Sequence, residues 1–211
     1  MHEYILGLLA ENAKKTIDKD VAELFGTYRE EGVPTILTDG LNELLLVASI
    51  KRPKKILELG TATGCSGIAL LRTLPDAYLY TVENREKSYN EAKENFAKFG
   101  VSDRVKQFLG DACDVIKTVG DGFDLVFLDC NKSKYKLLLP EIKKIMACGG
   151  VLFADNVLFR GYITGEVKPP HRFNTIKNNM REFLTMLTED EDFITTISDV
   201  GDGISISYKR R

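Results

Sequence analysis

Three side chains with oxygen donors follow two apolar segments of the sequence. Asp129 closes the run 123–129, and Asp155 and Asn156 come directly after the run 150–154. Both runs are typical of buried parallel strands, and such strands bring their carboxyl ends to one edge of a sheet. Two carboxylates and an amide, with no nitrogen or sulfur ligand, suit Mg²⁺, or Ca²⁺ or Mn²⁺ in its place. The sequence therefore predicts a divalent metal site at this edge.

A glycine-bearing loop follows an earlier apolar run, 56–59. Its glycines are Gly60, Gly64 and Gly67, a spacing that differs from the Gly-x-Gly-x-x-Gly of a dinucleotide site. A strand, a glycine loop and a helix in this order form a nucleotide-binding crevice at the carboxyl edge of an α/β sheet. Glu58 lies just ahead of the loop, where a carboxylate would repel phosphate but accept hydrogen bonds from an ammonium group. We therefore expect a cationic amino-acid nucleoside as the ligand.

Acidic residues also close the next two predicted strands. Glu83 ends the strand 78–82 and is placed to accept hydrogen bonds from a ribose diol. Asp111 follows the strand 105–109 and would lie beside an adenine; taken alone, it suits the N-cap of a helix equally well. The loop 35–38, ahead of the first strand, is expected near the amino-acid part of the nucleoside.

Composition and charge limit the class of protein. The chain has 211 residues, 44% of them hydrophobic, and a formal net charge of −2. This length supports one core, so we expect one domain over 1–211, and the charge gives no global argument for a polyanionic partner. No apolar run reaches membrane-spanning length and no signal peptide is visible, so a cytoplasmic protein is expected.

The cysteines do not form a recognisable metal or disulfide framework. They are Cys65, Cys113, Cys130 and Cys148, with no Cys-x-x-Cys pair and only two histidines in the chain. This excludes a usual zinc site and indicates reduced thiols.

The remaining sequence supplies the elements that position these residues. Residues 1–31 show helical spacing, with Ile5, Leu8, Leu9, Ile17, Val21, Leu24 and Phe25 on one face. With a helix over 39–50, capped by Asp39, they form an N-terminal helical cover (1–50) ahead of an α/β core (54–211). Further helices are predicted at about 65–74, 85–99, 134–147 and 173–189. The strands 193–198 and 204–208 lie too close for a helical crossover and are expected to form an antiparallel hairpin.

Taken together, these motifs resemble the metal-dependent class I O-methyltransferases related to catechol and caffeoyl-CoA methyltransferases. The resemblance covers almost the whole chain and rests on 57–66, 110–112, 128–135, 155–158 and 200–203. The chain is most similar to the bacterial branch that methylates 5-hydroxyuridine at the tRNA wobble position, through 32–34, 155–161 and the basic ending 209–211. The resemblance implies a Rossmann-like α/β fold with helices on both faces of a seven-stranded, mostly parallel sheet whose last strand is antiparallel. It also implies S-adenosyl-L-methionine as cofactor and a homodimer.

The resemblance also assigns roles by matching position. The cofactor would be held by Ile36, Glu58, Gly60, Ser66, Glu83, Asp111, Ala112 and Asp129, and the metal by Asp129, Asp155 and Asn156. Lys132 would lie near the acceptor hydroxyl and, with Asp129, form the catalytic pair. The chain departs from the family pattern at Cys130, where a small residue is usual, and at Ile36, where Met is common.

A basic segment follows the predicted metal ligands. Arg160, Lys168, Arg172 and Lys177 would meet the phosphates of a tRNA anticodon loop, although a solvated surface explains such a cluster as well. The stretch 168–181 lacks an unbroken Arg run. The sequence therefore supports the tRNA interpretation less strongly than it supports the metal-dependent chemistry.

The mechanism favours an acceptor with two neighbouring oxygens. A divalent cation that binds such a pair lowers the hydroxyl pKa and fixes its position for in-line attack on a sulfonium methyl group. Catechol presents such a pair, and so does 5-hydroxyuridine through O5 and O4. We therefore expect an S-adenosylmethionine- and Mg²⁺-dependent O-methyltransferase that converts 5-hydroxyuridine in tRNA to 5-methoxyuridine. The alternatives are a small-molecule catechol or phenylpropanoid O-methyltransferase and a nucleoside-binding protein without catalysis.

Overall fold

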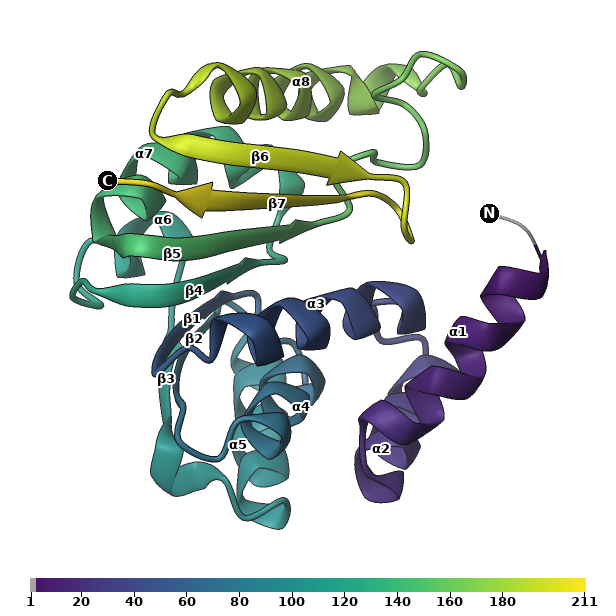
Figure 1. Cartoon of the computed structure of the whole chain (residues 1–211), viewed down its shortest axis with the longest axis vertical. Coiled ribbons are helices and arrows are strands. Elements are labelled where there is room, and N and C mark those ends of the chain that lie inside the picture. Colours follow the sequence, from purple (N-terminus) through teal and green to yellow (C-terminus); the bar gives the residue numbers. More distant parts are fainter. Residues whose placement is uncertain (1–2) are drawn as a thin grey trace.

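A seven-stranded sheet runs through the molecule, with helices packed on both of its faces (Figure 1). The computed structural model describes residues 3–211, except for the side chains of residues 3, 5, 6, 9, 10, 13 and 14. The strands are β1 (Lys55–Leu59), β2 (Tyr78–Glu83), β3 (Val105–Leu109), β4 (Phe123–Leu128), β5 (Met146–Asp155), β6 (Phe193–Ser198) and β7 (Ile204–Lys209). Their order across the sheet is β3-β2-β1-β4-β5-β7-β6.

The pairing of the strands determines where a ligand can bind. β1 pairs in parallel with β2 and β4, and β3 and β5 extend the sheet in parallel on either side. β7 runs antiparallel to both β5 and β6, so the predicted C-terminal hairpin and the predicted fold class are confirmed. The direction of strand addition reverses between β1 and β4. Ligands of such sheets bind beyond the carboxyl ends of the strands at this reversal.

Two hydrophobic cores lie on opposite faces of the sheet. The helices are α1 (Glu3–Thr16), α2 (Lys19–Glu30), α3 (Thr38–Lys51), α4 (Cys65–Thr73), α5 (Glu86–Lys98), α6 (Ala112–Val115), α7 (Tyr135–Ile145) and α8 (Asn174–Glu189), with short 3₁₀ turns η1 (Ser102–Arg104), η2 (Lys132–Lys134) and η3 (His171–Phe173). α2 to α5 contribute to one core and α6 to α8 to the other. In β1, Ile56 belongs to the first core and Leu57 to the second. Burial on both faces explains why the central strands read as continuous apolar runs.

The boundaries of β5, of α7 and of α3 differ from the sequence prediction. β5 begins at Met146, four residues ahead of the predicted start, and the preceding helix ends at Ile145. The sequence concealed this because the register of β4 and β5 shifts between Phe123 and Leu125, opposite two glycines that resemble a loop. α3 begins at Thr38, and Asp39 does not cap it: its carboxylate accepts hydrogen bonds from the Gly40 and Gly201 amides.

The N-terminal helices α1 and α2 are present as predicted, but their inward face is only partly as expected. Val21, Leu24 and Phe25 are buried in the first core, whereas Leu8 is 51% exposed. The side chains of Ile5 and Leu9 lie outside the described residues. α2 therefore packs on the α/β core through these three residues, and α3 packs on it through Leu41, Leu44, Leu45 and Ala48. Among the described residues, no helix combines the length and apolar character needed to span a membrane.

A buried tyrosine at the start of α7 joins the ends of the two central strands. The Tyr135 hydroxyl lies 2.9 Å from the carbonyl oxygen of Leu128 and 3.0 Å from that of Asp155. The ring is fully buried and packs edge-on against Phe183. Because these carbonyls terminate β4 and β5, Tyr135 sets the separation of the segments that carry the predicted metal ligands.

Replacement of Tyr135 by Phe removes this hydroxyl and keeps the ring. We expect the free energy of unfolding to fall by about 1 to 3 kcal/mol, because two buried carbonyls lose a donor. Urea unfolding of Tyr135→Phe measures the change, and Tyr78→Phe, at a ring that is 56% exposed, serves as the control. Equal stability of the two variants would contradict the proposed role of the hydroxyl.

Candidate active site

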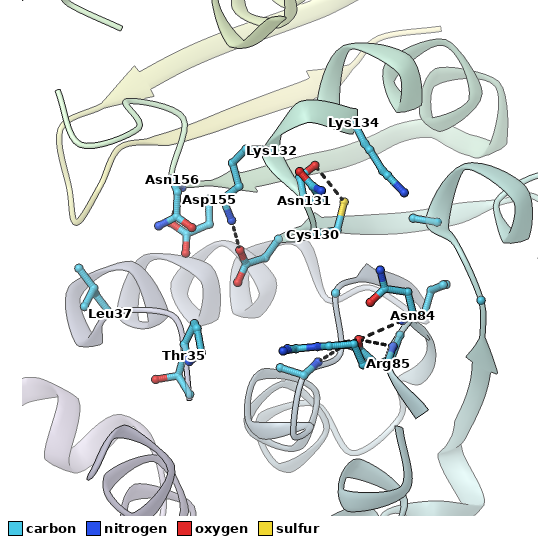
Figure 2. Close-up of a pocket in the computed structure, with 18 residues that line it drawn as sticks. Thr35, Leu37, Asn84, Arg85, Cys130, Asn131, Lys132, Lys134, Asp155 and Asn156 are labelled. Carbon is cyan, nitrogen blue, oxygen red and sulfur yellow. Dashed lines mark hydrogen bonds and ion pairs between the residues drawn. The ribbon is translucent and has the colours of Figure 1, made fainter. Parts of the chain in front are cut away.

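A cavity of about 570 Å³ opens at the carboxyl ends of the parallel strands (Figure 2). Its walls come from the segments that follow β1, β2, β3, β4 and β5, and from residues 34–37 ahead of α3. Of the predicted site residues, Gly60, Glu83, Ala112, Asp129, Lys132, Asp155 and Asn156 line it. Residues from five separate strands thus meet in one place, at the reversal of strand order.

The glycine loop allows the ends of β1 and β4 to approach closely. A Cβ atom on Gly60 would lie 2.2 Å from the Asp129 carbonyl oxygen, and the residue has a left-handed φ of 111°. The Asp129 amide donates to the Leu59 carbonyl oxygen at 2.9 Å. Only glycine fits this position, because any side chain would displace the backbone of Asp129.

Glu83 lies in the cavity wall with its carboxylate already oriented. Oε2 accepts a 2.9 Å hydrogen bond from the Ala62 amide, and Oε1 accepts from the amides of Asn84 and Arg85 at 3.0 and 2.9 Å. The side chain is 6% exposed. A carboxylate fixed by three backbone donors keeps its remaining lone pairs for a ligand, so this geometry suits the predicted ribose contact.

Glu58 lies behind the cavity wall and does not line the cavity. Its Oε1 accepts from the Ser66 hydroxyl at 2.5 Å and its Oε2 from the Thr81 hydroxyl at 2.6 Å. Thr81 also shares a 2.6 Å hydrogen bond with Thr61 of the glycine loop. Complete burial raises the pKa of Glu58 to about 7, in spite of the two hydroxyl donors. In this structure Glu58 joins β1, β2 and α4, and the predicted contact with an ammonium group stays a prediction.

The predicted contacts with the amino-acid part of the cofactor lie in a smaller cleft beside the main cavity. Ile36 and Ser66 both line this cleft, which shares Thr35, Gly60 and Asp129 with the cavity. Ile36 itself is buried. The cleft therefore continues the cavity toward the N-terminus of α4.

Arg29 of α2 holds the wall of this cleft, a function that the sequence did not reveal. Its Nε donates to the Thr35 hydroxyl at 3.1 Å, Nη1 to the Thr38 hydroxyl at 3.1 Å and Nη2 to the Ile36 carbonyl oxygen at 2.8 Å. The planar guanidinium suits such a set of acceptors. A basic residue in the last turn of a helix usually interacts with the helix dipole, so nothing in the local pattern distinguished Arg29.

Asp111 occupies the N-cap position of α6, the alternative that its sequence context left open. Its Oδ1 accepts from the Cys113 amide at 2.9 Å, and its other oxygen pairs with Lys134. The Lys134 contact, followed by the backbone donor, holds the pKa of Asp111 below its ordinary value. Asp111 does not line the cavity, whereas Lys134 and the adjacent Ala112 do. Contact of Asp111 with an adenine stays a prediction.

The predicted metal ligands and Lys132 converge at the other end of the cavity. Figure 2 shows Asp155 and Asn156 beside Lys132, whose Nζ lies 2.6 Å from Oδ1 of Asp129. Asp155 is 3% exposed, and burial, followed by the charge of Asp129, raises its pKa to about 7. The carboxylate of Asp129 therefore disfavours the charged form of Asp155, and the Lys132 ammonium is the nearby cation paired with Asp129.

The donor set fits a hard divalent cation. Asp129 and Asp155 supply carboxylate oxygens and Asn156 an amide oxygen, and Mg²⁺ sites in proteins commonly combine one or two carboxylates with water and substrate oxygens. Across residues 3–211, no three His, Cys, Asp or Glu side chains with described positions group around a common point. Two carboxylates and an amide are also not the nitrogen and sulfur ligands that structural zinc sites favour.

A cysteine in the cavity wall is not a nucleophile. Burial raises the pKa of the Cys130 thiol to about 12, so the thiol is neutral at pH 7. The four cysteines are free thiols. Covalent catalysis by a thiolate is thus a poor fit to this cavity.

The basic residues predicted to meet RNA lie outside the cavity. Arg160 is exposed four residues beyond Asn156, and Lys168 is exposed on the loop that follows. Arg172 is exposed and its guanidinium lies 4.8 Å from the centre of the Phe173 ring. Lys177 is half-buried in α8. The four residues belong to the chain segment that leaves the predicted metal ligands, but they do not converge on one point of the cavity.

Comparisons with known proteins agree on one family. Residues 12–210 match the sequence profile of a family described as "O-methyltransferase". A catechol O-methyltransferase from Niastella koreensis is 31% identical over 186 residues, 77% of this chain and 84% of the relative. The O-methyltransferase TomG from Streptomyces achromogenes, solved with SAM, is 28% identical with a TM-score of 0.80 and covers 92% of this chain and 91% of its own. The SAH-bound methyltransferase PaMTH1 from Podospora anserina is 25% identical with a TM-score of 0.84, over 100% of this chain and 97% of its own.

The raised pKa of Glu58 predicts a pH dependence of stability. Because its folded pKa of about 7 lies above the ordinary value of 4.5, the native state holds more protons than the unfolded state between these values. Stability contributed by this group therefore falls as the pH rises through that window. We expect Glu58→Gln to reduce the fall by up to about 3 kcal/mol.

Urea unfolding of the metal-free protein between about pH 5 and about pH 8 measures this dependence. Glu94→Gln, at an exposed glutamate of α5, is the matched control and should leave the dependence unchanged. An unaltered pH dependence in Glu58→Gln would show that Glu58 is not the group that titrates.

Proposed function

The chain belongs to the O-methyltransferase family, and from this membership we propose that it methylates an acceptor oxygen held beside a divalent metal ion, with S-adenosyl-L-methionine as the methyl donor. The observation that carries the proposal is the convergence of Asp129, Asp155, Asn156 and Lys132 in one cavity at the reversal of strand order. Glu83 lines the same cavity, on the side of β2.

One group of cavity residues would bind the cofactor, and another would bind the metal ion and the acceptor. Glu83 is oriented to hold a ribose diol, and Ile36 and Ser66, in the small cleft beside the cavity, would border the methionine part of the donor. Asp129, Asp155 and Asn156 would hold Mg²⁺, which when bound lowers the pKa of the acceptor hydroxyl and orients it. As the ammonium that its ion pair with Asp129 indicates, Lys132 would stabilise the oxyanion; only in its neutral form would it take the hydroxyl proton.

We propose 5-hydroxyuridine at the wobble position of tRNA as the acceptor, with 5-methoxyuridine as the product. O5 and O4 of this base form the neighbouring oxygen pair that the site requires. A wobble base lies in a loop, where it is accessible without opening a duplex. Exposed Arg160, Lys168 and Arg172, on the segment that follows Asn156, support contact with the phosphates of that loop.

A catechol-like small molecule is the second candidate acceptor. It presents the same pair of oxygens, and the Niastella koreensis relative is named a catechol O-methyltransferase. The cavity of about 570 Å³ is within the range that holds a cofactor and a small acceptor. This candidate requires none of the exposed basic residues.

We also propose that the enzyme is a homodimer that acts in the cytoplasm. Exposed Tyr4 and Leu8 on α1 support a second copy as the partner, because they present apolar surface on a helix outside the sheet. Sedimentation of the purified protein at monomer mass would contradict the dimer.

The acceptor is tested with purified protein, labelled S-adenosylmethionine and Mg²⁺. We expect label in tRNA isolated from cells that lack this gene, recovered as 5-methoxyuridine by nucleoside mass spectrometry, and none in tRNA without 5-hydroxyuridine. Transfer to catechol but not to tRNA would establish the second candidate in its place. Absence of transfer to either, with the cofactor bound, would leave a nucleoside-binding protein.

Asp155→Ala tests the metal site separately from the acceptor. We expect methyl transfer to fall by roughly 100-fold or more, because the acceptor oxygen loses its cation. Affinity for S-adenosylhomocysteine, measured by calorimetry, should stay within about threefold of the parent. Asp114→Ala, at a side chain that is 82% exposed, is the control. Full activity of Asp155→Ala would end the metal proposal.

A further inference from the structure

The turn Val200–Gly203 between β6 and β7 has no part in the proposed chemistry, yet it contacts the segment that carries Asn156. The amides of Val157 and Leu158 donate to the carbonyl oxygens of Gly203 and Asp202, both at 2.9 Å. A Cβ atom on Gly203, whose φ is 86°, would lie 2.7 Å from the Leu158 nitrogen. The turn and the segment after β5 are therefore in direct backbone contact.

The segment after β5 adopts a backbone that its residues do not favour alone. Asn156, Phe159 and Arg160 have left-handed φ values of 57°, 45° and 58°. Asparagine enters this region more readily than other residues with a Cβ, but phenylalanine and arginine rarely do, and such conformations persist where the surrounding structure enforces them. The segment thus requires an external hold to keep Asn156 directed into the cavity.

The Asp202 side chain supplies a contact that the backbone of the turn does not. Its Oδ1 accepts a 2.5 Å hydrogen bond from the amide of Arg160, the last of these three residues. Its carbonyl oxygen holds Leu158, so Asp202 contacts the segment at two points. Asp202 does not line the cavity, and it forms no ligand group with Asp129 and Asp155 among the described acidic side chains.

The same turn is fixed on its other side to the opposite wall of the cavity. The Gly201 amide donates to Oδ2 of Asp39 at 3.1 Å, and a Cβ atom on Gly201 would lie 3.6 Å from the Leu37 side chain. Leu37 itself lines the cavity. The turn therefore has a firm support from which Asp202 can hold the segment 157–160.

We propose that Asp202 is a positioning residue: by holding the Arg160 amide it fixes the left-handed segment after β5 and thereby places the Asn156 amide oxygen beside the two carboxylates. This inference rests on the proposed metal-dependent function. Residues that orient metal ligands without touching the metal commonly change its affinity by about 10-fold to 100-fold when they are replaced. Asp202 is then required for metal affinity but not for cofactor binding.

The test is Mn²⁺ binding to the full chain, followed by electron paramagnetic resonance without acceptor or methyl transfer. Asp202→Ala removes the acceptor of the Arg160 hydrogen bond, and Asp202→Asn keeps an oxygen at that position without the charge. We expect the alanine variant to bind Mn²⁺ about 10-fold to 100-fold more weakly. The asparagine variant should stay within about threefold of the parent, as should Asp199→Ala at an exposed residue just ahead of the turn.

Each other outcome contradicts either the proposed role of Asp202 or the proposed metal-dependent function on which that role rests. Equal Mn²⁺ affinity of Asp202→Ala and the parent would remove Asp202 from the site while the metal proposal stands. Equal losses in the alanine and asparagine variants would show that charge, and not position, is responsible. A parent protein that does not bind Mn²⁺ would contradict the proposed function itself. Retained affinity for S-adenosylhomocysteine excludes general unfolding as the cause of any loss.

Discussion

The burial of Asp155 next to the carboxylate of Asp129 is the constraint on which the candidate site depends. Two carboxylates at the ends of neighbouring strands cannot both be charged at low cost when one of them is buried, and the shifted titration of Asp155 expresses that cost. The fold holds them together through rigid backbone. The parallel pairing of β4 with β5 sets their spacing, and Tyr135 joins the ends of both strands. The proposed cation would relieve this cost by neutralising the two carboxylates.

The cofactor side of the cavity is organised by a different kind of contact. Glu58 and Glu83, at the carboxyl ends of β1 and β2, both use their oxygens within the protein. One lies behind the wall and supports Ser66 and Thr81; the other lies in the wall and is fixed by backbone amides. The acidic residues at these strand ends therefore do not have equivalent roles, although they look alike in the sequence.

Sequence patterns predicted the fold nearly in full because central parallel strands are buried on both faces and appear as apolar runs. The position of oxygen ligands after β4 and β5 followed from the same logic, since strand ends can be located from where those runs stop. The patterns failed where side chains act across distant segments. Nothing local indicated that Arg29 would hold residues 35–38 or that Asp202 would bond to Arg160. The strand-end position of Glu58 did not reveal that two hydroxyls engage its carboxylate, and its contact with a ligand stays a prediction.

The contacts of Arg29 have a consequence for how the chain can be divided. A fragment that began after α2 would retain the strands of the sheet and the acidic end of the cavity, since these lie downstream. It would lack the guanidinium that holds Thr35, Ile36 and Thr38, and it would lack Phe25, which lines the small cleft. Secondary structure suggests a division between the N-terminal helices and the α/β core. Such a division would separate residues that line the same cleft. Grafting or shortening of this protein has to treat α2 as part of the pocket.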